Sequence, residues 1–143
     1  QDLTVEENLR LGVSNDRMFA DGLDLITEHF PVIPERFKQK AGTLSGGEQR
    51  MLLVSRALIA QPRIMLIDEI SEGLQPTMVE RVANILKEAR RDLGVAILLV
   101  EQNLDFALSV ADRYAVLKLG EIVDQGNVSD DNAATHIRSY LQV

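Results

Sequence analysis

Cysteine is missing from this chain of 143 residues. Its absence excludes disulfide bonds and thiolate metal sites, and it is compatible with a cytoplasmic location. Long apolar stretches are missing too: the longest, Val95–Val100, is far shorter than the about 20 residues that span a bilayer. No secretory signal peptide is visible and the first residue is not Met, so we expect the sequence to be a piece of a longer chain.

Basic charge is scarce. Lys and Arg number 15 against 22 Asp and Glu, which gives a formal net charge of −7. Nucleic-acid backbones are bound by clustered Lys and Arg, so this balance argues against a nucleic-acid partner. Apolar residues at 45% and charged residues at 26% are ordinary for a globular domain with its own core.

A run of small residues opens an apolar segment near the middle of the chain. Residues 44–49 read L-S-G-G-E-Q, with Ser45 three positions before Glu48. This spacing is a capping box and predicts a helix start. Gly46 and Gly47 remove side chains there, so an anion can approach the bare backbone N–H groups and the positive end of the helix dipole.

A second pattern follows at residues 64–69. Four apolar residues end in Asp68 and Glu69, as in a buried strand that delivers two acids to its carboxyl edge. An anion site on one element and a carboxylate pair on the next indicate nucleotide chemistry.

These motifs carry a family resemblance. L-S-G-G-E-Q resembles the signature motif of ATP-binding-cassette (ABC) ATPases, residues 64–69 resemble their Walker B strand with the catalytic glutamate, and S-E-G-L at residues 71–74 resembles the D-loop. The resemblance extends from Leu3 to Leu141. Within the family, V-E-Q-N at residues 100–103 is most similar to the ATP-binding subunits of branched-chain amino acid and urea importers.

The resemblance implies an α/β fold: a partial core of the P-loop NTPases, with parallel strands flanked by helices, after a helical subdomain. We expect the helical subdomain at residues 1–61 and the C-terminal half of the nucleotide-binding core at residues 62–143.

Capping and turn signals predict the individual elements. Helices are expected from Thr4 to about Gly12, from Asn15 or Asp16 to about His29, from Glu35 to about Lys40, and from Ser45 to about Ala60. Beyond these we expect a strand at 64–68, a helix from about Thr77 to Asp92 ended by Gly94, a continuously buried strand at 95–100, a helix at 104–111, an edge hairpin of 114–119 with 121–124, and a helix capped by Ser129 or Asp130 that ends near Leu141.

Two surfaces are also predicted. The helix after Ser45 is expected to bury Leu52, Leu53, Ala57 and Leu58, with Arg50 and Arg56 outside. Arg36, Lys38 and Lys40 form a local basic face that either is solvated or contacts a partner.

The phosphate-cradling sequence G-x-x-x-x-G-K-[S/T] does not occur in the 143 residues. A helix N-terminus contributes about 0.3–1 kcal/mol to a nearby anion, and about 2 in sheltered geometry. Even a millimolar ligand needs roughly 4 kcal/mol. We therefore expect this polypeptide alone not to bind ATP usefully and to be inactive by itself. An incomplete parallel sheet also exposes apolar surface, so self-association is expected.

The resemblance assigns roles to the motif residues of the parent ATPase, whose ligands are ATP and Mg²⁺. The corner formed by Ser45, Gly46 and Gly47 would hold the γ-phosphate bound by the opposite subunit, and Gln49 would lie close to that site. Ser71 and Leu74 belong to the D-loop. The implied partners are a second ABC ATPase subunit, identical or different, and membrane permease subunits, at the inner face of the cell membrane.

The catalytic roles fall on the acid pair and its neighbour. By the same resemblance, Asp68 would hold Mg²⁺ and Glu69 would polarise the attacking water. Gln102 stands where the family has its switch histidine; an amide donates a hydrogen bond but carries no proton or charge at neutral pH. This suits a heterodimer whose partner carries the histidine.

Four further residues stand out. Gln75 replaces the common D-loop aspartate, and Ile70 replaces the usual proline after the glutamate. His29 and His136 match no motif and are expected to be surface residues. Gln1 lies too close to the first helix to be the family's Q-loop glutamine.

Two other functions remain open. One is a soluble or exporter-linked cassette ATPase. The other is a truncated, non-catalytic module that pairs with a complete subunit. The reading frame upstream of residue 1 discriminates them, because an encoded G-x-x-x-x-G-K-[S/T] favours an ATPase and a start codon near Gln1 favours the module.

Overall fold

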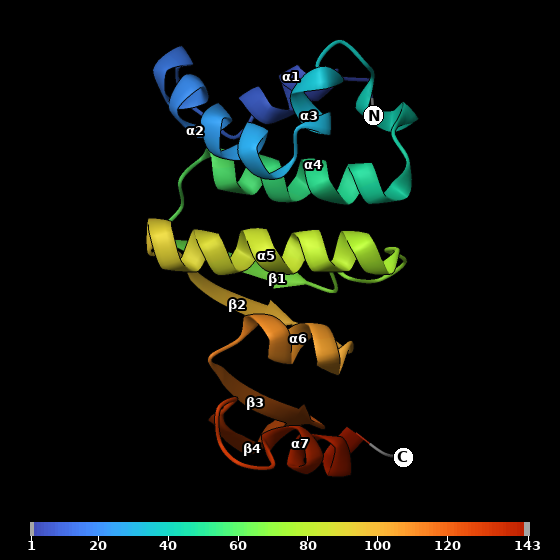
Figure 1. The fold of residues 1–143 in the computed structure, drawn as a ribbon, viewed down its shortest axis with the longest axis vertical. Helices are drawn as coiled ribbons and strands as arrows, with labels where there is room; N and C mark the ends of the chain where they lie inside the picture. The colour runs from blue at the N-terminus through green and yellow to red at the C-terminus, as the bar shows by residue number, and fades with distance from the viewer. Residues whose placement is uncertain (1, 142–143) are drawn as a thin grey trace.

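The computed structural model describes residues 2–141, so the expectation for Gln1 lies outside the described residues. The elements form an elongated stack (Figure 1). The N-terminal end consists of helices without strands, α5 and two strands lie in the middle, and a hairpin with α7 lies at the far end. The N-terminal helices are α1 (Val5–Arg10), α2 (Asp16–His29), α3 (Val32–Glu35), the 3₁₀ helix η1 (Ala41–Thr43) and α4 (Gly46–Ile59). The rest are β1 (Ile64–Asp68), α5 (Pro76–Leu93), β2 (Ala96–Val100), α6 (Leu104–Val110), β3 (Arg113–Lys118), β4 (Glu121–Asn127) and α7 (Ala133–Leu141). This confirms the α/β class with parallel strands.

The predicted helix ends are mostly confirmed. Thr4 caps α1 in a capping box, and its backbone N–H donates to Glu7 Oε2 at 2.7 Å. Of the two candidate caps of α2, Asn15 is the cap, and its side chain accepts from the backbone N of Met18 at 2.9 Å. Gly94 ends α5 with φ 65°, a left-handed conformation that glycine adopts without strain. Within residues 2–141, no helix is long and apolar enough to cross a membrane.

Two local predictions are wrong. Residues 35–40 are not a helix, because their backbone serves the start of α1: the carbonyls of Phe37 and Gln39 accept from Glu6 N at 3.2 Å and from Val5 N at 2.9 Å. At the other end, neither Ser129 nor Asp130 caps α7, which starts only at Ala133. The Asp130 carboxylate instead accepts from Asn127 N at 3.1 Å and closes the turn after β4.

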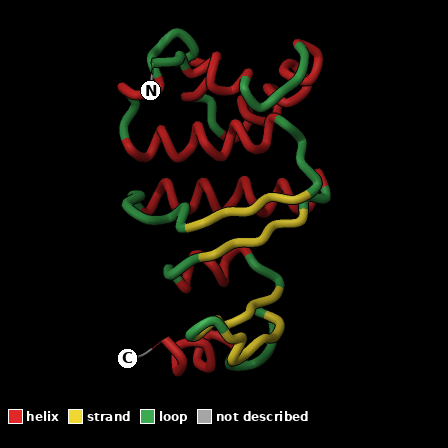
Figure 2. The backbone as a smooth tube through the Cα atoms, turned by 180° about the vertical axis from the view of Figure 1, so that it is seen from behind, coloured by secondary structure: helices red, strands yellow, loops and turns green. Residues whose placement is uncertain are grey.

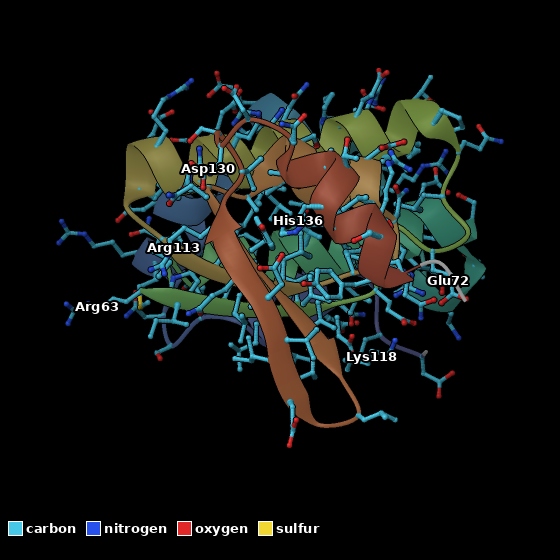
Figure 3. The ribbon with its side chains drawn as sticks, turned by 90° about the horizontal axis from the view of Figure 1, so that it is seen from below. Arg63, Glu72, Arg113, Lys118, Asp130 and His136 are labelled. Atoms are coloured by element: carbon cyan, nitrogen blue, oxygen red, sulfur yellow. The ribbon has the colours of Figure 1, made fainter. Side chains whose placement is uncertain are left out.

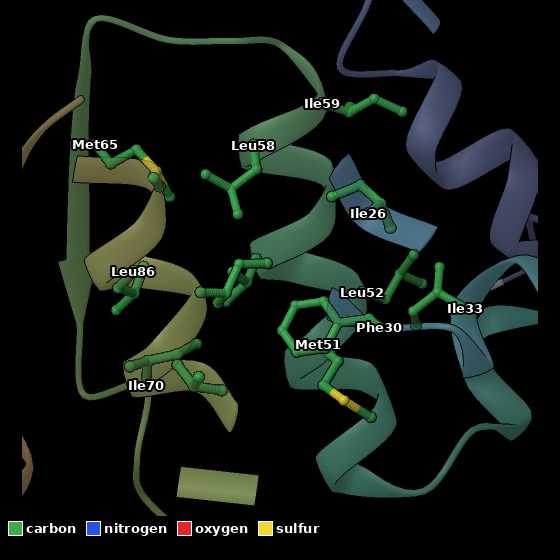
Figure 4. Packing of buried hydrophobic residues seen from close by; sticks show 14 of the residues in the cluster. Ile26, Phe30, Ile33, Met51, Leu52, Leu58, Ile59, Met65, Ile70 and Leu86 are labelled. Carbon is green, nitrogen blue, oxygen red and sulfur yellow. The ribbon is translucent and has the colours of Figure 1, made fainter. Parts of the chain in front are cut away.

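Helix α4 is the centre of the core (Figure 4). It lies between α1 and α2 on one side and α5 on the other. Because α4 is packed on two sides, the single stripe predicted for it is only half right: Leu52 and Leu58 are buried, whereas Leu53 is 44% exposed and Ala57 is exposed. The other buried residues of α4 are Met51, Val54, Ser55 and Ile59.

The parallel pair β1–β2 runs in register from Ile64 opposite Ala96 to Asp68 opposite Val100. Figure 2 shows both strands from behind, with the helices on their other side. Leu66 is 76% exposed and Leu98 62% exposed, so β2 is not continuously buried as predicted. The open face of this sheet is the exposed apolar surface expected for an incomplete sheet.

The hairpin β3–β4 forms a two-stranded antiparallel sheet of its own. The prediction that it is the edge of the parallel sheet is therefore wrong for the described residues, and β4 is longer than expected. Leu119 and Gly120 both have positive φ, 52° and 85°, which matches the tight hairpin turn that fits strand twist. Figure 3 shows the hairpin extending away from the helices, with Lys118 near its turn.

Candidate functional site

The first turn of α4 is fastened by its own side chains. Ser45 is the N-cap, and its hydroxyl donates to Glu48 Oε2 at 2.7 Å while the backbone N of Ser45 donates to the same oxygen at 2.8 Å. Arg36 Nη2 pairs with Glu48 Oε1 at 3.0 Å. Gln49, predicted to lie close to the phosphate site, donates to the carbonyl of Leu44 at 3.0 Å. The corner at residues 44–49 is thus held rigid by contacts inside the chain.

These contacts make Glu48 a pH-sensitive part of the fold. Hydrogen bonds from the side chain and then the backbone of Ser45 lower the pKa of Glu48. A group whose pKa is lower in the folded state contributes fully to stability above its unfolded pKa of about 4.3, and the contribution is lost as the pH falls through the folded value. We expect Glu48→Gln to lower the free energy of unfolding by about 0.3–1 kcal/mol at pH 7, as for a charge at a helix N-terminus.

Urea unfolding between pH 3 and 7 checks this. The difference between wild type and Glu48→Gln should narrow as the pH falls below about 4. Glu121→Gln on the exposed hairpin is the control and should leave stability unchanged over the range. A difference for Glu48→Gln that is the same at every pH would contradict the carboxylate's role.

The two glycines of this corner are not required by the chain's own fold. A Cβ on Gly46 would meet nothing within 4 Å, and one on Gly47 would make only ordinary contacts, the nearest with Leu74 Cδ2 at 3.7 Å. Neither has a positive φ. Glycine costs roughly 0.5–1 kcal/mol relative to alanine in a helix interior, and less in the first turn, where Gly46 and Gly47 stand. The glycines therefore indicate that something outside the chain approaches this surface.

Backbone donors are free on the same surface. The N–H of Glu48 is taken by the Ser45 hydroxyl, and the N–H of Gln49 by the carbonyl of Ser45 at 2.9 Å. Within the described residues this leaves the N–H groups of Gly46 and Gly47 unpaired. The first N–H groups of a helix have no partner inside the helix, and the Ser45 cap reaches only that of Glu48. The arrangement can bind an anion.

The acid pair lies at the carboxyl end of β1. Figure 3 shows Arg63 and Glu72, which flank this strand, at opposite sides of the molecule. Asp68 is exposed, and Glu69 follows with a φ of 47°, a left-handed conformation that costs a non-glycine residue about 1–2 kcal/mol. Its backbone N donates to Val100 O at 2.9 Å, and its Oε1 accepts from Gln102 Nε2. The structure thus joins Glu69 to Gln102, 33 residues later in the chain.

Asp68 is suited to be one of several ligands of a magnesium ion. The described residues contain no group of three or more His, Asp or Glu side chains that could hold a metal alone. Mg²⁺ is usually bound by one or two carboxylates together with phosphate oxygens and water rather than by a cage of protein ligands. An exposed carboxylate beside Glu69 suits that mode.

One site residue was missed from the sequence. Glu101 holds Ser71: its Oε1 accepts from Ser71 N at 2.9 Å and its Oε2 from Ser71 Oγ at 3.0 Å. A signal was present, because Glu101 directly follows β2 and the carboxyl ends of parallel strands meet at one edge. Leu74 is half-buried and faces Gly47, so the structure brings residues 71–74 to the start of α4.

Four other residues can now be placed. His29 is less exposed than a surface residue was expected to be: its side chain is 17% exposed, and its Nε2 lies 2.8 Å from Glu88 Oε2 of α5. His136 is 62% exposed, as expected. Ile70 is buried in the core, a packing role that explains its side chain. Gln75 precedes α5 and makes no capping hydrogen bond with its side chain.

Comparison with known proteins gives the following matches. Residues 8–100 match the family model described as "AAA domain, putative AbiEii toxin, Type IV TA system". The chain is 46% identical over 123 residues to the high-affinity branched-chain amino acid transport ATP-binding protein BraG of Pseudomonas aeruginosa, covering 85% of the chain and 52% of that protein. It is 35% identical over 130 residues to the probable branched-chain amino acid transport ATP-binding protein LivF of Archaeoglobus fulgidus, covering 90% and 55%.

Other matches extend this group. The methionine import ATP-binding protein MetN of Mannheimia succiniciproducens is 30% identical over 130 residues, covering 89% of the chain and 38% of that protein. Among solved structures, MJ1267, an ATP-binding cassette of an ABC transporter, superposes with a TM-score of 0.75 at 25% identity, covering 95% of the chain and 62% of that structure. The chain spans about half the length of the first two curated relatives.

Proposed function

The chain belongs to the ATP-binding proteins of ABC transporters, and from this premise we propose that it is the signature-motif and Walker B half of an ATP-hydrolysing importer subunit. The observation that carries the proposal is the pair of glycines at the start of α4. Both could be alanine without any clash in the fold, yet both leave backbone N–H groups open to an anion. A terminal phosphate presented by another polypeptide is the anion this corner suits.

The acid pair supplies the chemistry. Asp68 would hold Mg²⁺, which when bound would supply positive charge to stabilise the phosphates. Glu69 accepts a hydrogen bond from the water that attacks the γ-phosphate, through the carboxylate oxygen that Gln102 does not use. The Gln102 amide orients this carboxylate. Phosphoryl transfer needs mainly positioning and charge stabilisation, so few groups suffice.

The proposed ATPase needs further parts that these 143 residues do not supply. The P-loop that cradles the β- and γ-phosphates comes from another segment or subunit, since the motif does not occur here. We place a second ATPase subunit, identical or different, against the start of α4 and the D-loop at Ser71 and Leu74. Residues 1–61 form the helical subdomain, which contacts the membrane permease at the inner face of the cell membrane.

The cargo we propose is a branched-chain amino acid or a similar small polar solute. Two relatives bear that cargo in their names, and the more similar of them is 46% identical to this chain. A methionine importer component is also similar, at 30% identity, so methionine is the competing cargo.

Uptake by vesicles that contain the complete transporter tests the function. We expect ATP-dependent leucine accumulation that unlabelled isoleucine competes away. Asp68→Asn should reduce it to background because the Mg²⁺ ligand is weakened, whereas Asp131→Asn, at an exposed position beyond β4, should leave it unchanged. Accumulation of methionine without leucine would reassign the cargo, and full accumulation by Asp68→Asn would contradict the ATPase role.

A further inference from the structure

Three consecutive residues, the last of β2 and the two that follow it, hold the segment that follows β1. Val100 accepts from the backbone N of Glu69 at 2.9 Å. Glu101 binds Ser71 through both carboxylate oxygens, at 2.9 and 3.0 Å, and Gln102 donates to the Glu69 carboxylate. The hydrogen-bond ladder of the parallel sheet is thus continued by side chains beyond its last paired residues, Asp68 and Val100.

The Glu101 contact is well suited to fix a position. The bonds are charge-assisted and come from both donors of one residue, an arrangement stronger and more directional than a single neutral hydrogen bond. Ser71 is 7% exposed and its neighbour Ile70 is 6% exposed, so packing also restrains this segment. Both Glu101 oxygens accept hydrogen bonds from Ser71, whereas the Glu69 carboxylate accepts from Gln102.

We propose that Glu101 is a positioning residue that couples Gln102 to the D-loop. One peptide bond joins Glu101 to Gln102, so a phosphate that draws the Gln102 amide away from Glu69 also shifts Glu101, and Ser71 with it. From Ser71 the shift reaches Leu74, which faces Gly47 at the start of α4. The inference rests on the proposed function, because the phosphate in question is that of bound ATP.

The contact itself is tested in this chain by a double-mutant cycle. Glu101→Gln keeps the size of the side chain but provides one acceptor oxygen, and Ser71→Ala removes the hydroxyl donor. Urea unfolding of wild type, the two single variants and the double variant gives the coupling. We expect strong non-additivity, with the double variant no less stable than Glu101→Gln alone. Additive effects would overturn the proposed coupling.

The role is tested by ATP hydrolysis in the complete subunit dimer. Glu101→Gln and Ser71→Ala should each lower kcat by about 10- to 100-fold with the KM for ATP unchanged, because the reacting groups are displaced while the nucleotide is still bound. The double variant should be no slower than the slower single variant, and Glu121→Gln, a matched change on the exposed hairpin, should match wild type. A structural role alone would lower the melting temperature without this separation of kcat from KM, so unchanged kcat for Glu101→Gln overturns the inference. Absence of hydrolysis by the wild-type dimer would overturn the proposed function as well, which distinguishes the two failures.

Discussion

Replacing Glu69 with glutamine is expected to lower the kcat of ATP hydrolysis in the complete subunit by about 10²–10⁴-fold, the range typical of a general base. Glutamine has nearly the same shape, can keep a hydrogen bond to Gln102 and can adopt the same left-handed backbone. What it loses is the negative charge that polarises the attacking water. Binding of Mg-ATP should persist, because Asp68 and the start of α4 are unchanged.

Steady-state hydrolysis and equilibrium nucleotide binding, measured on the same preparation, separate these effects. The control is Glu80→Gln at an exposed position of α5, which makes the same change in net charge on an element outside the acid pair and should hydrolyse ATP at the wild-type rate. If Glu69→Gln retained wild-type kcat, the catalytic assignment would be wrong. If it lost ATP binding as well, Glu69 would be a binding residue instead.

Local features of the fold could be predicted because their signals are short in sequence. The capping boxes at Thr4 and Ser45 each place donor and acceptor three residues apart, and both are present in the structure. Gly94 stands directly after the last helical residue of α5. The β1 prediction matches residue for residue, since four apolar residues between a proline turn and two acids have few alternatives.

Burial was harder to predict, because it depends on what covers each face. The β2 sequence is apolar throughout, as in a strand buried on both sides, but helices cover only one face of this pair and Leu98 is exposed. Leu52 and Leu53 of α4 are adjacent and of the same residue type, yet Leu52 is buried and Leu53 is exposed. No periodicity within one segment specifies how many neighbours pack around it.

The long-range polar contacts could not be predicted by spacing. Glu101 meets Ser71 across 30 residues, and His29 of α2 meets Glu88 of α5, which lies far along the chain. Within the candidate site, the sequence therefore indicated Glu69 and Gln102 separately but not that they are bonded, and it gave no role to Glu101.

Replacing Gly46 with aspartate is expected to separate folding from function most sharply. In the fold the change is favourable: the Cβ meets no atom within 4 Å, glycine is replaced at the first position of a helix, and a negative charge in the first turn adds about 0.3–1 kcal/mol. Urea unfolding should show equal or greater stability. In the proposed function the same carboxylate faces a phosphate, and two like unit charges about 4 Å apart repel by about 4 kcal/mol at an effective dielectric constant of about 20.

That repulsion corresponds to a loss of about 10³-fold in the ATP-dependent association of two subunits. Gly46→Ala is the matched control: it adds the same Cβ without charge, so its loss should be smaller and should not depend on salt. Sedimentation of the complete subunit with Mg-ATP at low and high ionic strength measures the association of both variants. Salt screens the charge repulsion caused by aspartate but does not change the steric effect of the alanine methyl group. Equal association of Gly46→Asp and wild type would show that no phosphate reaches this corner, and the glycines would then need another explanation.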